Sequence, residues 1–132
     1  MPKLMIIDDA VSLTKYYAGI ARQIGFDVDI VNDSEEALSR CVACAPDVVI
    51  LDIIMPGKDG FEVLEELQSL PSPPPIIVIS GYGDSCLRFA AVGSRMHSRE
   101  LAAVMRKPLR KADLEDALLR AVGKPSRSEL AC

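Results

Sequence analysis

The feature that most constrains the fold of this sequence is a set of short apolar runs, each ending at an acidic or hydroxyl residue. The three runs of this kind are KLMIID (residues 3–8), DVVILD (47–52) and IIVIS (76–80). Their continuous apolar character is typical of strands covered on both faces. Segments with helical spacing of apolar residues separate them, which predicts a parallel sheet with helices on both of its faces.

Weaker segments complete this pattern. The alternating segment DVDIV (27–31) predicts a second strand. LAAVM (101–105) predicts a fifth, although its alanine content would also permit a helix. Helices are expected over 12–24, 61–70, 84–96 and 111–122, with Gly25 just past the end of the first. One further helix should open near Asn32–Ser34, with an inner face made of Ala37, Leu38, Cys41 and Ala45.

Length and charge narrow the class of protein. A chain of 132 residues is expected to form one domain. Its net charge of −4 lacks the basic excess of a nucleic-acid surface, so we expect no direct contact with nucleic acid. No apolar run approaches the roughly 20 residues of a membrane helix. The first predicted strand begins almost at once, so we expect no signal peptide. We therefore expect a cytoplasmic protein that does not bind membranes.

The cysteine pair in CVAC (41–44) has two interpretations. A CxxC spacing is found in zinc sites and in redox-active sites. However, no second pair follows, and His97 is the one histidine of the sequence. Since residues three apart share a helix face, we favour small packing residues over a site at Cys41 and Cys44.

Chemically active residue types gather at one predicted edge of the sheet. In a parallel sheet the carboxyl ends of the strands meet, which should bring together Asp8, Asp9, Asp52, Ser80 and Lys107. Three carboxylates in one place repel one another, and a hard cation such as Mg²⁺ relieves that repulsion while leaving room for a phosphate. An aspartate nucleophile, a hydroxyl and a lysine beside Mg²⁺ point to phosphoryl transfer.

The sequence resembles the receiver domain of bacterial two-component response regulators over residues 3–122. Four motifs in order carry the resemblance: IIDDA, VVILDIIMPGKDG, IVISGYG and RKPL. The resemblance implies a flavodoxin-like, doubly wound sheet of five parallel strands in the order 2-1-3-4-5, with five helices on two faces. It also implies a receiver domain over residues 1–122, followed by a polar, disordered tail over 123–132.

The resemblance also implies a role for each site residue. Asp52 would be the phosphoacceptor, Ser80 the switch hydroxyl and Lys107 the lysine that pairs with the phosphate. A Mg²⁺ ion would be held by four groups: the carboxylates of Asp8, Asp9 and Asp52, and the backbone carbonyl of Ile54. The implied partners are a sensor histidine kinase or phosphotransfer protein, and a downstream protein target or fused output domain; a homodimer is also compatible.

Two departures from the family pattern bear on switching. Val104 stands three residues before Lys107, where receivers usually carry an aromatic residue coupled to the switch hydroxyl. The segment between Ser80 and Lys107 is also longer than usual, with the extra residues around 92–100. This longer segment resembles receivers found with EAL-type cyclic-di-GMP phosphodiesterases.

Two other functions compete with the phosphoacceptor. A pseudo-receiver would bind partners without phosphorylation, but it would be expected to lose an acid or the lysine. A small Mg²⁺-dependent phosphatase with an aspartate nucleophile would need a second acid two residues after its nucleophile, and Ala10 occupies that position after Asp8. We therefore expect a signalling switch, with slow loss of its own phosphate, and not an enzyme.

Overall fold

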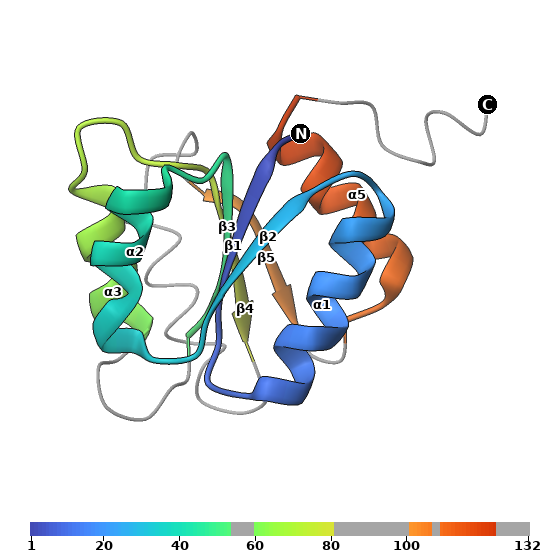
Figure 1. Cartoon of the computed structure of the whole chain (residues 1–132), viewed down its shortest axis with the longest axis horizontal. Helices are drawn as coiled ribbons and strands as arrows, with labels where there is room; N and C mark the ends of the chain where they lie inside the picture. The colour runs from blue at the N-terminus through green and yellow to red at the C-terminus, as the bar shows by residue number, and fades with distance from the viewer. Residues whose placement is uncertain (54–59, 81–100, 107–108, 124–132) are drawn as a thin grey trace.

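The computed structural model describes residues 1–53, 60–80, 101–106 and 109–123, which form a layered α/β fold (Figure 1). Its five strands are parallel and lie in the order β2-β1-β3-β4-β5. The strands are β1 (Lys3–Ile7), β2 (Asp27–Val31), β3 (Val48–Asp52), β4 (Ile76–Ser80) and β5 (Leu101–Arg106). This confirms the flavodoxin-like sheet and its order, and it resolves the alanine-rich fifth segment as a strand.

The described helices form a layer on each side of the sheet. They are α1 (Val11–Gln23), α2 (Ala37–Cys44), α3 (Gly60–Gln68) and α5 (Lys111–Ala121), with a short 3-10 helix η1 (Ser34–Glu36) before α2. α1 and α5 cover one face, and α2 and α3 cover the other (Figure 1). The helix expected over 84–96 and the tail after residue 123 lie outside the described residues. Among the described residues, no helix has the length and apolar character needed to cross a membrane.

The core explains why the central strands read as continuous apolar runs. Along β1, Leu4 and Ile6 pack toward α1 and α5, whereas Met5 and Ile7 pack toward α2 and α3. Every residue of β3 is buried. Since both faces of these strands are covered, the alternation of apolar and polar residues that marks a half-exposed strand is absent.

Several predicted boundaries differ from the structure by one or two residues, and two of these differences bear on the argument. β1 ends at Ile7, one residue before the expected Asp8, although the backbone N–H of Asp8 still donates to the carbonyl of Val31 at 3.1 Å. Ala45 is exposed and does not belong to the inner face of α2. It ends the helix in the left-handed region, with φ of 47°, and its N–H donates to the carbonyl of Cys41.

The two cysteines of α2 have separate environments. Cys41 is buried in the core between the sheet and helices α2 and α3, where burial raises the pKa of its thiol. The thiol of Cys44 donates to Asp29 of β2 at 3.0 Å, and this hydrogen bond is the main reason that its pKa is raised. Both thiols therefore stay protonated near neutral pH, as expected for packing residues.

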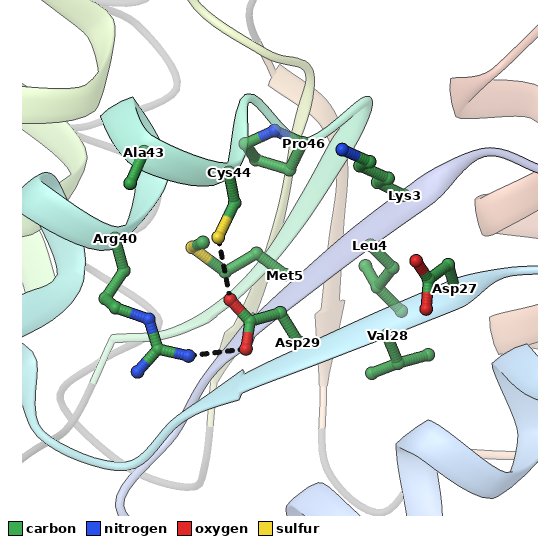
Figure 2. Close-up of a pocket in the computed structure, with 10 residues that line it drawn as sticks. All are labelled: Lys3, Leu4, Met5, Asp27, Val28, Asp29, Arg40, Ala43, Cys44 and Pro46. Carbon is green, nitrogen blue, oxygen red and sulfur yellow. Dashed lines mark hydrogen bonds and ion pairs between the residues drawn. The ribbon is translucent and has the colours of Figure 1, made fainter.

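A pocket of about 570 Å³ lies between β2 and α2 (Figure 2). At the wall of this pocket, Arg40 and Cys44 of α2 both contact the carboxylate of Asp29. The pocket also borders the first residues of β1, from Lys3 to Met5, so it lies toward the amino ends of the strands.

Candidate functional site

Three carboxylates converge at the opposite, carboxyl edge of the sheet. Asp8 and Asp9 follow β1, and Asp52 is the last residue of β3. β1 and β3 are neighbours in register, with Ile7 beside Leu51. One carboxylate oxygen from each of Asp8, Asp9 and Asp52 lies within 4.8 Å of the others. The predicted convergence of these three acids is confirmed.

The burial of these acids makes the cluster costly without a cation. Asp8 and Asp52 are 0% and 3% exposed, whereas Asp9 is exposed. Like charges at this separation repel strongly when they are removed from water. Clustered carboxylate oxygens with one side open to solvent are the donor set that Mg²⁺ prefers, since this ion keeps several waters. The residues present therefore fit the cation that the sequence predicts.

Three hydrogen bonds position Asp8. Its Oδ1 accepts from the N–H of Ala10 at 3.0 Å, which forms a tight turn into α1. Its backbone N–H donates to Val31, and its backbone carbonyl accepts from the side-chain amide of Asn32 at 2.8 Å. From the sequence, Asn32 is predicted only as a helix-capping candidate, and no sequence pattern indicates this contact. In fact Asp33 caps η1, since its carboxylate accepts from the N–H of Glu35.

The segment after Asp52 is held by close backbone contacts. The N–H of Ile53 donates to the carbonyl of Ile79 on β4 at 3.1 Å, which extends the ladder by one bond past Asp52. The N–H of Gly60, at the start of α3, donates to the carbonyl of Ile53 at 3.2 Å. A Cβ on Gly60 would lie closer than 3.0 Å to backbone atoms of Asp52 and Ile53. The close approach of α3 to the end of β3 therefore requires glycine at this position.

Burial and the acid cluster both raise the pKa of the phenol of Tyr17. Tyr17 lies in α1 and is 2% exposed. Burial, followed by the negative charges of Asp8 and Asp52, raises its pKa to about 12. The hydroxyl therefore stays neutral over the physiological range, and Tyr17 adds no further negative charge near the carboxylates.

The other predicted site residues are placed only in part. Ser80 is the last residue of β4, and its backbone lies beside Arg106 of β5. Ser80 thus ends its strand at the same edge as Asp52, as predicted. Val104 is paired with Val78 within the sheet. Lys107 and Ile54 lie outside the described residues, so their predicted roles stay predictions.

The fold and the acid cluster together define the class of protein to which this chain belongs. It is a doubly wound, parallel α/β domain with a cluster of three carboxylates where the strands end. A family model, the response regulator receiver domain, matches residues 4–119. The chain therefore belongs to the receiver-domain family of response regulators.

Individual relatives agree with this assignment. The chain is 38% identical over 122 residues to a probable transcriptional regulator, ycf27, of Guillardia theta, covering 91% of this chain and 44% of that protein. It is 29% identical to the DNA-binding response regulator MtrA of Mycolicibacterium smegmatis, covering 92% of this chain and 56% of that protein. A response regulator receiver domain protein from Clostridium thermocellum superposes with a TM-score of 0.81 at 25% identity, with all of both chains covered.

The relatives also bear on the expected partners. The chain spans about half the length of the curated relatives it matches. A sensor kinase as partner and an output domain therefore stay predictions for this chain. The expectation of no direct contact with nucleic acid is not supported, because the relative from M. smegmatis is named as a DNA-binding protein. The resemblance to receivers of EAL-type phosphodiesterases stays a prediction.

Proposed function

We propose that Asp52 accepts a phosphoryl group from a sensor histidine kinase or phosphotransfer protein, in a Mg²⁺-dependent reaction that switches a protein-binding surface. The observation that carries this proposal is the cluster of Asp8, Asp9 and Asp52 at the carboxyl edge of the sheet. Asp52 suits the acceptor role because it ends a fully buried central strand and is itself almost fully buried. A rigid strand end holds a nucleophile more exactly in place than a loop does.

The reaction needs little more than positioning and charge. An oxygen of Asp52 forms a bond to phosphorus while the bond from phosphorus to the donor's nitrogen breaks, leaving an acyl phosphate on Asp52. When bound by Asp8, Asp9 and Asp52, Mg²⁺ supplies positive charge for the phosphoryl oxygens. The buried acids orient the reacting groups, and the exposed side at Asp9 leaves a path for the donor.

The remaining roles belong to the same proposal. The backbone carbonyl of Ile54 completes the metal ligands, Lys107 pairs with the bound phosphate, and Ser80 hydrogen-bonds one phosphoryl oxygen. The added charge then shifts a two-state equilibrium toward a surface that binds a downstream protein target or output domain, or a second copy of the chain. We place this switch in the cytoplasm, as the family's link to sensor kinases suggests.

Intact-mass spectrometry with a small phosphodonor tests the proposal. Wild type incubated with acetyl phosphate and Mg²⁺ should gain the mass of one phosphoryl group, and omission of Mg²⁺ should abolish the gain. The Asp52→Asn variant should gain nothing. Asp27→Asn is the matched control, because Asp27 is an exposed acid of β2, and this variant should behave as wild type. An adduct on Asp52→Asn equal to that on wild type would contradict the proposal.

We also propose that the chain has no turnover on outside phosphate esters. Its chemistry would be limited to its own phosphorylation and slow dephosphorylation. Incubation with p-nitrophenyl phosphate and Mg²⁺ should release no p-nitrophenol above the buffer rate. Steady release that Asp52→Asn abolishes would instead support the phosphatase alternative. Failure of wild type to accept phosphate from any donor would support the pseudo-receiver.

A further inference from the structure

We propose that Asn32 is a positioning residue for the Mg²⁺ site, because it fixes the peptide group between Asp8 and Asp9. This inference rests on the proposed function, since it concerns the metal on which phosphorylation would depend. Asn32 follows the last residue of β2 and is exposed. Its side-chain amide donates to the backbone carbonyl of Asp8 at 2.8 Å, across 24 positions of sequence.

The position of that carbonyl gives the contact its significance. The carbonyl of Asp8 belongs to the peptide group that joins Asp8 to Asp9. Rotation about the bond between the Cα and the carbonyl carbon of Asp8 would turn this carbonyl and move Asp9 relative to the buried Asp8. It would therefore change the spacing of two of the three clustered carboxylates. A hydrogen bond that holds the plane therefore holds two predicted metal ligands in one geometry.

Asn32 binds the carbonyl of Asp8 just beyond the point where β2 leaves the sheet. The N–H of Asp8 still makes a ladder bond to Val31. In a regular parallel ladder its carbonyl would then accept from a backbone N–H further along β2. The chain instead turns at Asp33 into η1, whose first turn is capped by that residue. The amide of Asn32 supplies the donor that the departing backbone does not.

A second contact ties the same amide to α1. The Nδ2 of Asn32 lies 3.4 Å from the hydroxyl of Thr14, which is fully buried and donates to the carbonyl of Val11 at 2.7 Å. Since an amide nitrogen has two hydrogens, it can donate to Asp8 and to Thr14 together. Asn32 thus links β2, the loop after β1 and the first turn of α1, which are the elements around the acid pair.

The test compares Mg²⁺ affinity in two neighbouring variants. Asn32→Ala removes the amide, and Asp33→Ala removes the cap of η1 without touching the peptide of Asp8. The dissociation constant for Mg²⁺ would be measured by amide NMR titration of the unphosphorylated protein. We expect Asn32→Ala to weaken binding roughly tenfold, as is usual for groups that orient metal ligands, and Asp33→Ala to bind as wild type.

A kinetic measurement separates positioning from folding. In phosphorylation by acetyl phosphate, Asn32→Ala should need more Mg²⁺ for half-maximal rate but should reach the wild-type rate at saturation. Asn32→Ser, whose hydroxyl is too short to reach Asp8, should behave in the same way if the alanine variant folds poorly. Circular dichroism melts would verify that both variants fold.

Each outcome decides the inference. Unchanged Mg²⁺ affinity in folded Asn32 variants would overturn it, and so would an equal loss in Asp33→Ala, which would indicate a general weakening of the end of β2. If wild type binds Mg²⁺ but accepts no phosphoryl group, the proposed function fails while the affinity comparison still judges Asn32. If wild type binds no Mg²⁺, both fail.

Discussion

At the scale of single residues, Gly60 is the glycine, among those that the structure describes, where an added carbon would clash most. Its Cβ would meet three backbone atoms at the end of β3, and backbone cannot move aside as a flexible side chain can. We expect Gly60→Ala to lower the free energy of unfolding by roughly 1–3 kcal/mol and to weaken Mg²⁺ binding, since the clash displaces Asp52.

Chemical denaturation with and without Mg²⁺ measures both effects of Gly60→Ala. Gly19→Ala is the matched control, because Gly19 lies in α1 with open space around it. Alanine is the better helix former there, by about 1 kcal/mol, so this variant should be more stable than wild type. Equal stability of the two variants would show that the close approach of α3 to β3 is not as described.

At Ala45 the opposite substitution, alanine to glycine, should stabilise the protein. It ends α2 with φ of 47°, a conformation that costs an L-residue roughly 1–2 kcal/mol but is easy for glycine. Glycine loses more conformational entropy on folding than alanine, which offsets part of this gain. Ala45→Gly should therefore raise the free energy of unfolding by roughly 0.5–1 kcal/mol. Urea melts would measure this gain.

Ala43→Gly is the control for Ala45→Gly. Ala43 is exposed inside α2, where glycine should cost about 1 kcal/mol. Loss of stability in both variants would contradict the left-handed cap. Ala45 itself is not a usual helix-ending residue, since glycine or asparagine is common there, but Pro46, which follows it, is a signal that the helix ends.

At the scale of elements, Asp29 links β2 to α2 and controls the thiol of Cys44. The hydrogen bond to Asp29 raises the pKa of Cys44, so little reactive thiolate forms near neutral pH. Asp29→Ala removes that acceptor and its negative charge, so the thiol pKa should fall. The guanidinium of Arg40, which lowers the pKa of Cys44, stays near the sulfur and is no longer paired with Asp29. We expect Cys44 to be alkylated faster in this variant at pH 8 than in wild type.

Peptide mapping after timed exposure to iodoacetamide measures that rate. Cys41 is the internal control, because its burial in the core should keep it unmodified in both proteins. Faster modification of Cys41 as well would mean that Asp29→Ala has loosened α2. An unchanged rate at Cys44 would contradict the proposed control by Asp29.

The elements show what the sequence can and cannot predict. Strand identity followed from apolar runs such as residues 47–52, because burial on both faces leaves a strong signal. The order of the strands was implied only by the resemblance to receiver domains. The convergence of Asp8, Asp9 and Asp52 followed from the rule that parallel strands end at one edge. The contact from Asn32 to Asp8 could not be predicted, since it depends on where β2 leaves the sheet and joins residues 24 positions apart.

At the scale of the whole molecule, the acid cluster couples stability to Mg²⁺. A ligand that binds only the folded state stabilises it by RT ln(1 + [L]/Kd), which is about 1.4 kcal/mol at ten times Kd. Mg²⁺ should therefore raise the melting temperature of wild type by a few degrees. Asp9→Asn should lose most of this shift, because it removes the exposed carboxylate of the cluster.

Calorimetry in buffers of matched ionic strength checks the Mg²⁺ shift. Na⁺ in place of Mg²⁺ controls for screening of the net charge of −4. Asp33→Asn, a change of an exposed acid outside the cluster, should keep the shift. An equal Mg²⁺ shift in wild type and Asp9→Asn would mean that the ion stabilises the fold from another place.

The central claim is that Asp52 carries the phosphoryl group, and chemical trapping of the acyl phosphate tests it most directly. Borohydride reduces an aspartyl phosphate to homoserine, and peptide sequencing by mass spectrometry then locates that residue. After reaction with acetyl phosphate and Mg²⁺, we predict homoserine at position 52 and at no other acid. Homoserine at Asp8 or Asp9, or its absence from a protein that has gained phosphoryl mass, would contradict the account.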